Sequence, residues 1–137
     1  MICRWMILVT GLWAIAVLAG CSGVETESRV RGSAVGTCDL IVKFNGKSDD
    51  RDFEVPCPAS STVLSILHSS PLLFEMIGQS DTTAFIVSID GVENEKSLGD
   101  NWVYRVNGSL GDTSAGLFQV RPGDTVEWTF GKYRPDD

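Results

Sequence analysis

The chain has 137 residues, enough for one domain, and its formal net charge of −7 combines 18 acidic with 11 basic residues. All of the acidic residues and 10 of the basic ones follow position 20, so the chain without its first 20 residues carries a formal charge of −8. Nucleic acid and anionic bilayers attract basic surfaces and repel a domain this acidic. The charge therefore excludes nucleic acid as a partner, and membrane attachment by surface charge with it.

The first 20 residues have the pattern of an export signal. Arg4 supplies a positive charge, and residues 5–19 form an uncharged, largely apolar run. That length suits the core of a signal peptide and falls short of the roughly 20 residues that a membrane-spanning helix needs. We therefore predict a cleaved signal peptide at residues 1–20.

Residues 18–21 read Leu-Ala-Gly-Cys, which resembles the lipobox of bacterial lipoproteins. The resemblance implies a lipid thioether on Cys21, cleavage before it and N-acylation, which together place two or three acyl chains on one residue. The alternatives are an ordinary secretory signal or an uncleaved anchor, with Cys21 incidental. By the same resemblance, Ser22 in place of Asp favours the outer membrane of a two-membrane bacterium. The expected location is the extracytoplasmic side of the cell envelope.

A small, polar stretch without hydrophobic periodicity follows at residues 22–36. Such composition is typical of a flexible tether. We assign the lipidated cysteine and the linker to residues 21–37, and the folded domain to residues 38–137.

The domain is predicted to begin with a β-hairpin. Residues 39–44 are rich in branched and aromatic side chains, residues 45–50 form a turn cluster, and residues 51–55 alternate polar with apolar side chains. This pattern is typical of two antiparallel strands.

Two cysteines lie at the open end of this hairpin. If Phe44 faces Arg51 across the turn, Cys38 lies opposite Cys57, close to disulfide range. Export would place both in an oxidising compartment. We predict a disulfide between Cys38 and Cys57; a thiol pair for metal or redox use is the alternative.

A short helix follows the hairpin. Val63, Ile66 and Leu67 have helical spacing after a Ser/Thr cap, and Pro71 bounds the helix. Residues 72–77 are expected to form a short second helical turn or a packed loop. One helix against a mixed sheet predicts an α+β, β-grasp-like fold. The remaining strands are predicted at residues 84–89, 102–106, 117–120 and 125–130.

The segments Trp-Val-Tyr-Arg-Val-Asn-Gly at residues 102–108 and Pro-Gly-Asp-Thr-Val-Glu-Trp at residues 122–128 resemble a known family. It comprises bacterial domains of unknown function grouped with the C-terminal domain of transcobalamin and intrinsic factor. The resemblance covers most of residues 38–133. It implies a β-grasp-like fold and a corrinoid such as cobalamin among the candidate ligands.

The candidate ligand-binding residues lie in the first of these segments. Trp102 and Tyr104 share one strand face and could stack on a flat ligand. Asn107 and Gly108 form a tight turn after the strand. Core packing is the alternative role of the two aromatic residues.

The sequence lacks the usual signs of an enzyme or metal site. His68 is the one histidine, the acidic cluster at residues 49–54 lacks the pattern of a calcium loop, and residues 111–116 lack the lysine of a phosphate-binding loop. We therefore predict no catalytic residues, no metal site and no resident cofactor.

The leading hypothesis is a non-enzymatic, lipid-anchored binding or interaction module. Trp102, Tyr104 and the loop at residues 109–116 would face a small molecule or an envelope protein. One alternative is a structural envelope or scaffold protein without a small ligand. Another is an enzyme that uses carboxylates such as those of Asp100 and Asp112.

Overall fold

The computed structural model describes residues 35–97 and 99–134. The predicted signal peptide, Cys21 and nearly all of the predicted linker lie outside these residues. Among the helices in the described part of the chain, none has the length and hydropathy needed to span a bilayer.

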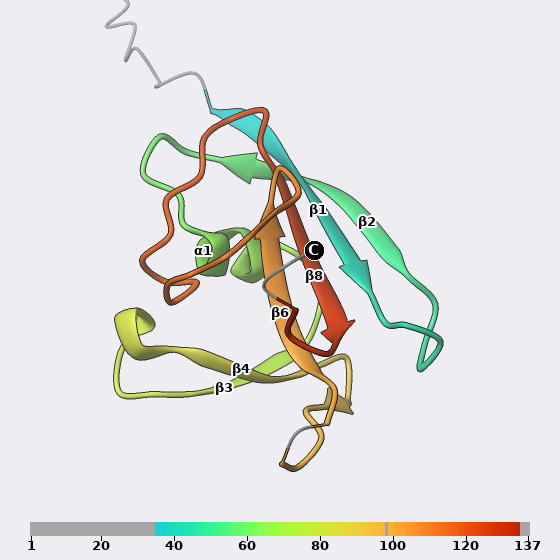
Figure 1. Cartoon of the computed structure of the whole chain (residues 1–137). Helices are drawn as coiled ribbons and strands as arrows, with labels where there is room; N and C mark the ends of the chain where they lie inside the picture. The colour runs from blue at the N-terminus through green and yellow to red at the C-terminus, as the bar shows by residue number, and fades with distance from the viewer. Residues whose placement is uncertain (1–34, 98, 135–137) are drawn as a thin grey trace, which may run out of the picture.

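The larger layer is a five-stranded mixed sheet in the order β2-β1-β8-β6-β7 (Figure 1). The first and last long strands, β1 and β8, lie side by side in parallel, and the other neighbours are antiparallel. Buried residues alternate with partly exposed ones along the long strands, so one face of this sheet is the core face. The strands are β1 (Gly36–Lys43), β2 (Arg51–Cys57), β6 (Asn101–Val106), β7 (Ser109–Leu110) and β8 (Thr125–Gly131).

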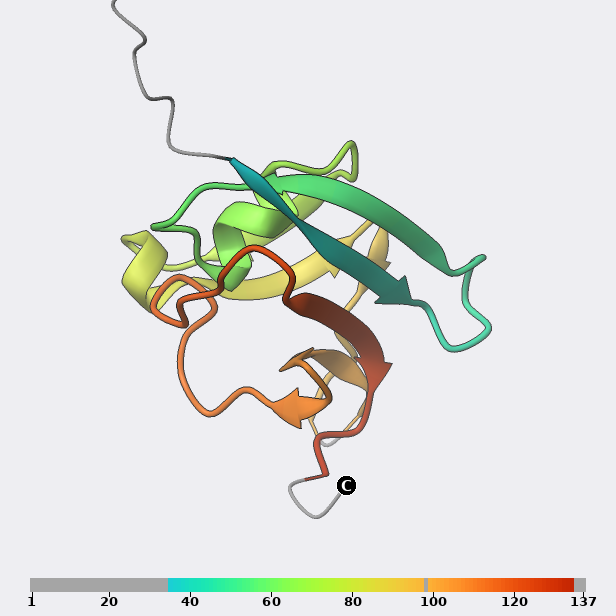
Figure 2. The same ribbon diagram turned by 90° about the horizontal axis from the view of Figure 1, so that it is seen from above.

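The predicted helix is confirmed as α1 (Val63–His68), which lies on the core side of this sheet (Figure 2). Thr62 is its N-cap, and the Ser65 N–H donates to the Thr62 hydroxyl while the Ser65 hydroxyl accepts from the Thr62 N–H. This capping box satisfies N–H groups that the first turn leaves free. The apolar side chains of the helix are buried and pack towards β1 and β2.

A second, three-stranded sheet has the order β3-β4-β5 and packs beside β6 (Figure 1). It contains β3 (Phe74–Ile77), β4 (Phe85–Ile89) and β5 (Val92–Glu93), and a 3-10 turn, η1 (Asp81–Thr83), precedes β4. The expectation of a helical turn or loop at residues 72–77 was therefore wrong. The backbone N–H and carbonyl groups of β3 form antiparallel hydrogen bonds with β4 in place of helical ones.

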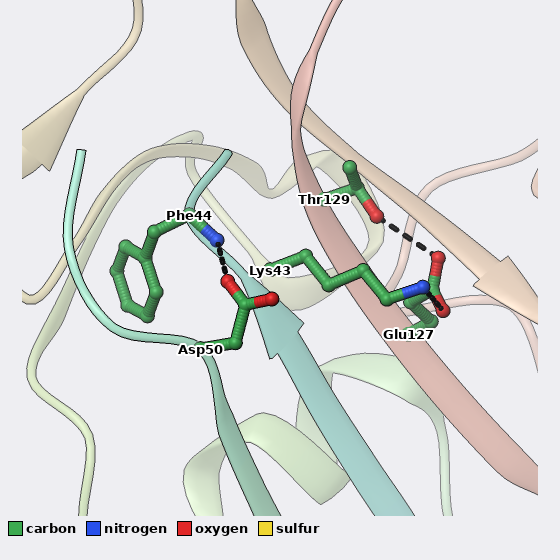
Figure 3. A network of polar contacts seen from close by, with 5 residues as sticks. All are labelled: Lys43, Phe44, Asp50, Glu127 and Thr129. Atoms are coloured by element: carbon green, nitrogen blue, oxygen red, sulfur yellow. Dashed lines mark hydrogen bonds and ion pairs between the residues drawn. The ribbon is translucent and has the colours of Figure 1, made fainter. Parts of the chain in front are cut away.

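The hairpin is confirmed, but its predicted register is wrong by two residues. Cys38 pairs with Val55, and Cys57 pairs with Gly36. The reason is the turn, where the Asp50 carboxylate accepts a hydrogen bond of 2.9 Å from the Phe44 N–H (Figure 3). Phe44 therefore belongs to the turn, and the two cysteines are diagonal neighbours.

The described structure moves two other expected boundaries. The first strand begins at Gly36, two residues before the expected start of the domain. The expected strand at residues 117–120 is reduced to one bridge between Gln119 and Thr62. This segment instead runs along the start of α1, where the Val63 N–H donates to the Phe118 carbonyl at 3.0 Å.

The opposite face of the larger sheet is polar. Lys43 on β1 forms an ion pair of 2.7 Å with Glu127 on β8, and the Thr129 hydroxyl donates to the same carboxylate at 3.0 Å (Figure 3). Because Lys43 is half exposed, this pair contributes less than about 1 kcal/mol. The parallel strands are thus held mainly by their ladder and by the core beneath them.

Candidate functional site

A pocket of about 290 Å³ lies between β4 and β6. This volume is at the lower end for small-molecule sites and equals the space of about ten liquid waters. Its walls come from the start of β4, the middle of β6 and the loop at residues 110–115. The lining side chains are mostly apolar or aromatic, and none of them carries a charge at neutral pH.

Trp102 and Tyr104 line this pocket, and they also belong to the core. They are 4% and 8% exposed. The Trp102 indole N–H donates to the Val92 carbonyl at 2.7 Å, and the Tyr104 hydroxyl donates to the Thr113 carbonyl at 2.7 Å. The two proposed roles, core packing and pocket lining, are therefore combined in the same side chains.

Trp128 on β8 forms another part of the pocket wall. It lies opposite Tyr104 in the β6–β8 ladder, and their ring centroids are 5.5 Å apart. Trp128 is 3% exposed, and its indole nitrogen is a buried donor with no hydrogen-bond partner among the residues that the structure describes. Trp128 was not among the candidate ligand-binding residues predicted from the sequence.

The glycine-rich loop is fixed to its surroundings by close backbone contacts. A Cβ atom on Gly111 would lie 2.0 Å from the Tyr104 ring, and one on Gly116 would lie 1.9 Å from the Asp81 carbonyl oxygen. The Ser114 hydroxyl lies 3.3 Å from the same carbonyl oxygen, to which it donates. Glycine is needed here for close approach, and the loop completes one wall of the pocket.

Two aromatic side chains lie at the mouth of the pocket. Phe85 on β4 is 51% exposed, and Tyr133, beyond the end of β8, is 60% exposed. Neither was identified from the sequence, because Phe85 reads as an ordinary strand residue and Tyr133 lies in no motif.

The pocket favours neutral groups. Burial raises the pKa of the Tyr104 hydroxyl, and the charge of Asp112 raises it further, although hydrogen bonding to Thr113 opposes the shift. Tyr104 therefore stays protonated as a hydrogen-bond donor at neutral pH.

The structure does not bring Asn107 and Gly108 to this pocket. Asn107 has a φ of 50° in the turn between β6 and β7, and its amide donates to Asp124 at 2.9 Å and accepts from the Thr125 N–H at 2.9 Å. The hydrogen bond from Asn107, followed by that from the Arg121 N–H, lowers the pKa of Asp124. This geometry gives Asn107 a role in joining the turn to the start of β8.

Cys38 and Cys57 are buried, and the structure shows them as thiols. The Cys38 thiol donates to the Arg121 carbonyl at 3.1 Å. Burial, followed by hydrogen bonding and charge interaction with Cys57, raises the pKa of Cys38 to about 12. The two side chains are thus close enough to interact, and the disulfide stays a prediction.

The remaining polar side chains that were weighed for catalysis or metal binding do not form a site together. Asp100 lines a separate depression with Asn45 and Arg105, whereas Asp112 is near enough to Tyr104 for its charge to raise the pKa of that hydroxyl. The His68 ring packs against Phe74 with centroids 4.7 Å apart. Within residues 35–97 and 99–134, no three His, Cys, Asp or Glu side chains are grouped to hold a metal ion.

Comparison with solved structures finds the same fold in binding proteins. Haptocorrin in complex with Cbi matches with a TM-score of 0.62 and 21% identity, over 73% of this chain and 26% of that chain. A candidate metal binding protein from Ruminococcus gnavus ATCC 29149 matches with a TM-score of 0.59 and 22% identity, over 72% of this chain and 99% of that chain. This chain thus spans about a quarter of the haptocorrin chain, and at these identities the likeness shows the fold alone.

No curated protein sequence matches this chain. A family model does match, over residues 60–132, and it is described as a domain of unknown function, DUF4430. That match runs from the cap of α1 to the end of β8 and includes most residues that line the pocket. The chain therefore belongs to the DUF4430 family.

Proposed function

We propose that this protein is a non-enzymatic binding module, anchored by lipid on Cys21 to a cell-envelope membrane on its extracytoplasmic side. Its domain holds a small, flat, mainly apolar ligand in the pocket between β4 and β6. The observation that carries this proposal is the group of aromatic side chains around one cavity, Trp102, Tyr104 and Trp128 in the wall with Phe85 at the mouth. Aromatic rings bind flat apolar groups through large contact areas.

Support from the fold comes from two sources. The parallel β1–β8 pair between antiparallel neighbours, with α1 on the core face, fits a β-grasp-like arrangement. Haptocorrin, which was solved with Cbi, has a similar fold. A complete corrinoid is much larger than 290 Å³, so only one edge of such a ligand could enter this pocket.

Tryptophan fluorescence tests the pocket directly. The full chain in detergent is titrated with one- and two-ring aromatic compounds and with cyanocobalamin. We expect saturable changes from the small compounds, and weaker binding in Tyr133→Ala, which opens the mouth. Asn107→Gly is the matched control, because that turn lies away from the pocket. Flat titrations with every compound would contradict a small-ligand function.

The anchor has a separate test. Cys21→Ala should leave the domain folded and either release it from the membrane fraction or stall it as uncleaved precursor. Metabolic labelling with a palmitate analogue, followed by fractionation of the membranes, measures both outcomes. Normal lipid labelling of the variant would overturn the assignment of Cys21.

A structural or scaffold role is the second candidate. It is favoured by exposed apolar side chains on the smaller sheet, where Ile77 on β3 pairs with Phe85 on β4 and Leu73 is 79% exposed. Such surfaces often mark protein partners. This role predicts that crosslinking in cells captures one stable envelope partner and that Ile77→Lys abolishes the capture.

A further inference from the structure

We infer that the ligand of this pocket is an uncharged planar compound with a hydrogen-bond acceptor that pairs with Trp128 Nε1. This inference rests on the proposed function and specifies the chemical class of ligand for the same site. It follows from the distribution of hydrogen-bond partners and charges around the pocket.

The buried donors around the pocket differ in whether they have a hydrogen-bond partner. The wall contains three buried aromatic side chains with a donor. The Trp102 indole N–H donates to the Val92 carbonyl, and the Tyr104 hydroxyl donates to the Thr113 carbonyl. Trp128 Nε1 has no partner, although buried tryptophan N–H groups usually find one because an unmade hydrogen bond is costly. The Trp128 side chain, which lines the pocket, therefore carries one donor without a partner among the described residues, and a ligand acceptor would satisfy it.

The position of that nitrogen limits how the acceptor can reach it. The atom is covered in this structure, so contact requires a small side-chain adjustment in the wall. Phe85 and Tyr133 at the mouth are about half exposed and are free of tight packing on one side. Binding that moves these side chains is compatible with the rigid β6–β8 ladder beneath them.

The described lining of the pocket holds no charged side chain that could pair with an ion. An anionic ligand would find no basic side chain among these lining residues, and the charge of Asp112 reaches Tyr104. A cationic ligand would find no carboxylate among the same lining residues. Burying an unpaired charge costs far more than burying a neutral polar group. The pocket therefore selects a neutral compound.

Matched two-ring probes separate the acceptor from the ring. Naphthalene has the shape alone, while quinoline and isoquinoline add one nitrogen acceptor and are neutral at pH 7.5. N-methylquinolinium and 2-naphthoate supply a cation and an anion of similar size. We expect the better of quinoline and isoquinoline to bind about five- to tenfold more tightly than naphthalene, which is the effect of one net hydrogen bond.

The substitution Trp128→Phe keeps a ring and removes the N–H. In this variant the affinity ratio of the azine to naphthalene should fall to about one. Trp102→Phe is the matched control: it removes an N–H that already has a partner, and the ratio should persist. In the native full chain in detergent, the Trp128 indole N–H signal in a ¹H–¹⁵N spectrum should move downfield with the azine and move little with naphthalene. That measurement needs no variant, so it remains informative if Trp128→Phe fails to fold.

The outcomes distinguish the two proposals. If naphthalene, quinoline and isoquinoline bind the native protein equally, the pocket is a ring site without an acceptor partner and this inference is wrong. Tightest binding of N-methylquinolinium would instead assign an aromatic cage for cations, and tightest binding of 2-naphthoate an anion site. If no probe binds, the small-ligand function itself is contradicted.

Discussion

The two edges of β6 are held in different ways. Along β8 an unbroken antiparallel ladder runs from Asn101 to Val106. On the other edge β7 covers only the last two residues, and a side chain bridges the gap to β4. The Asn94 side-chain amide accepts a hydrogen bond from the Trp102 backbone N–H at 2.7 Å and donates one to the Ile86 carbonyl at 2.8 Å. The ladder leaves no space between β6 and β8, whereas the edge of β6 that faces β4 leaves room for the pocket.

This contrast shows how one strand can belong both to a rigid sheet and to a binding site. Trp102 and Tyr104 are aligned by the ladder, so their rings need no ligand to hold them in place. Their other side faces loops that are joined by a few specific contacts. Four changes test the contrast, in order of decreasing effect.

The largest effect is expected from the ladder side. Phe44 is fully buried and packs edge-to-face on Trp102 with centroids 5.3 Å apart. Phe44→Ala should lower the free energy of unfolding by about 3–5 kcal/mol through the cavity that it leaves. Urea denaturation measures this loss. The exposed Ile77→Ala is the control and should change the value by less than about 0.5 kcal/mol; equal losses would show that the core does not lie here.

The buried cysteine pair should make the stability of the reduced protein depend on pH. The pKa of Cys38 rises to about 12 on folding, so the unfolded chain releases this proton first as pH increases. The stability that this proton contributes is complete below about pH 8.5, the pKa of an unfolded cysteine, and it is lost progressively as the pH rises from there through the raised pKa of Cys38. Urea unfolding at several pH values measures it.

The control for this prediction is the same protein after oxidation. A disulfide between Cys38 and Cys57 has no thiol proton to release, so its stability should lack this loss. Thiol counting in denaturant identifies the form that cells produce. Two free thiols in unreduced protein exported by cells would refute the predicted disulfide.

The bridged edge should depend on one side chain. Asn94→Ala leaves the Trp102 backbone N–H and the Ile86 carbonyl without this partner. The free energy of unfolding should fall by about 2–3 kcal/mol. Hydrogen exchange should show faster exchange at Trp102 than at its ladder neighbours. The matched control is Asn101→Ala, which removes only a local bond of 2.9 Å to the Gly99 carbonyl. If both variants lose the same stability, Asn94 does not bridge the sheets in solution.

The smallest change adds one methyl group to the pocket loop. Gly111→Ala would place that group against the Tyr104 ring, so we expect a loss of about 1–3 kcal/mol and weaker binding of small aromatic compounds. Gly131→Ala is the control, because nothing lies within 4 Å of its added Cβ atom. Thermal unfolding and fluorescence titration measure the two effects. Unchanged binding would place the ligand elsewhere.

The elements with strong local patterns were predictable from the sequence. The Thr62 cap and the apolar spacing after it predicted α1, and alternation predicted that Trp102 and Tyr104 share one face of β6. The strand β3 was missed because Leu73 and Ile77 are apolar yet exposed, so their pattern suggests packing that the structure does not provide. The hairpin register was wrong because the Asp50 side chain, which no periodicity reveals, closes the turn on Phe44.

The pocket was only partly predictable. Trp102 and Tyr104 were identified from their motif and from alternation, and both line the cavity. Its other walls come from segments about 30 residues apart, and the Ser114 hydroxyl joins them by donating to the Asp81 carbonyl. Such an approach between two loops leaves no local sequence signal. Asn107 was a misleading candidate because residues that favour tight turns resemble those that bind ligands.

The parallel pairing of β1 with β8 sets the order in which the sheet can form. Asp39 pairs with Thr125, so β1 finds its central neighbour only after the chain between them has been brought into place. The β1–β2 hairpin can form early, but its inner edge stays open until then. Contacts between such distant positions slow folding, and an open edge invites pairing with other chains. A chain that lost its final strand would therefore expose the middle of its sheet.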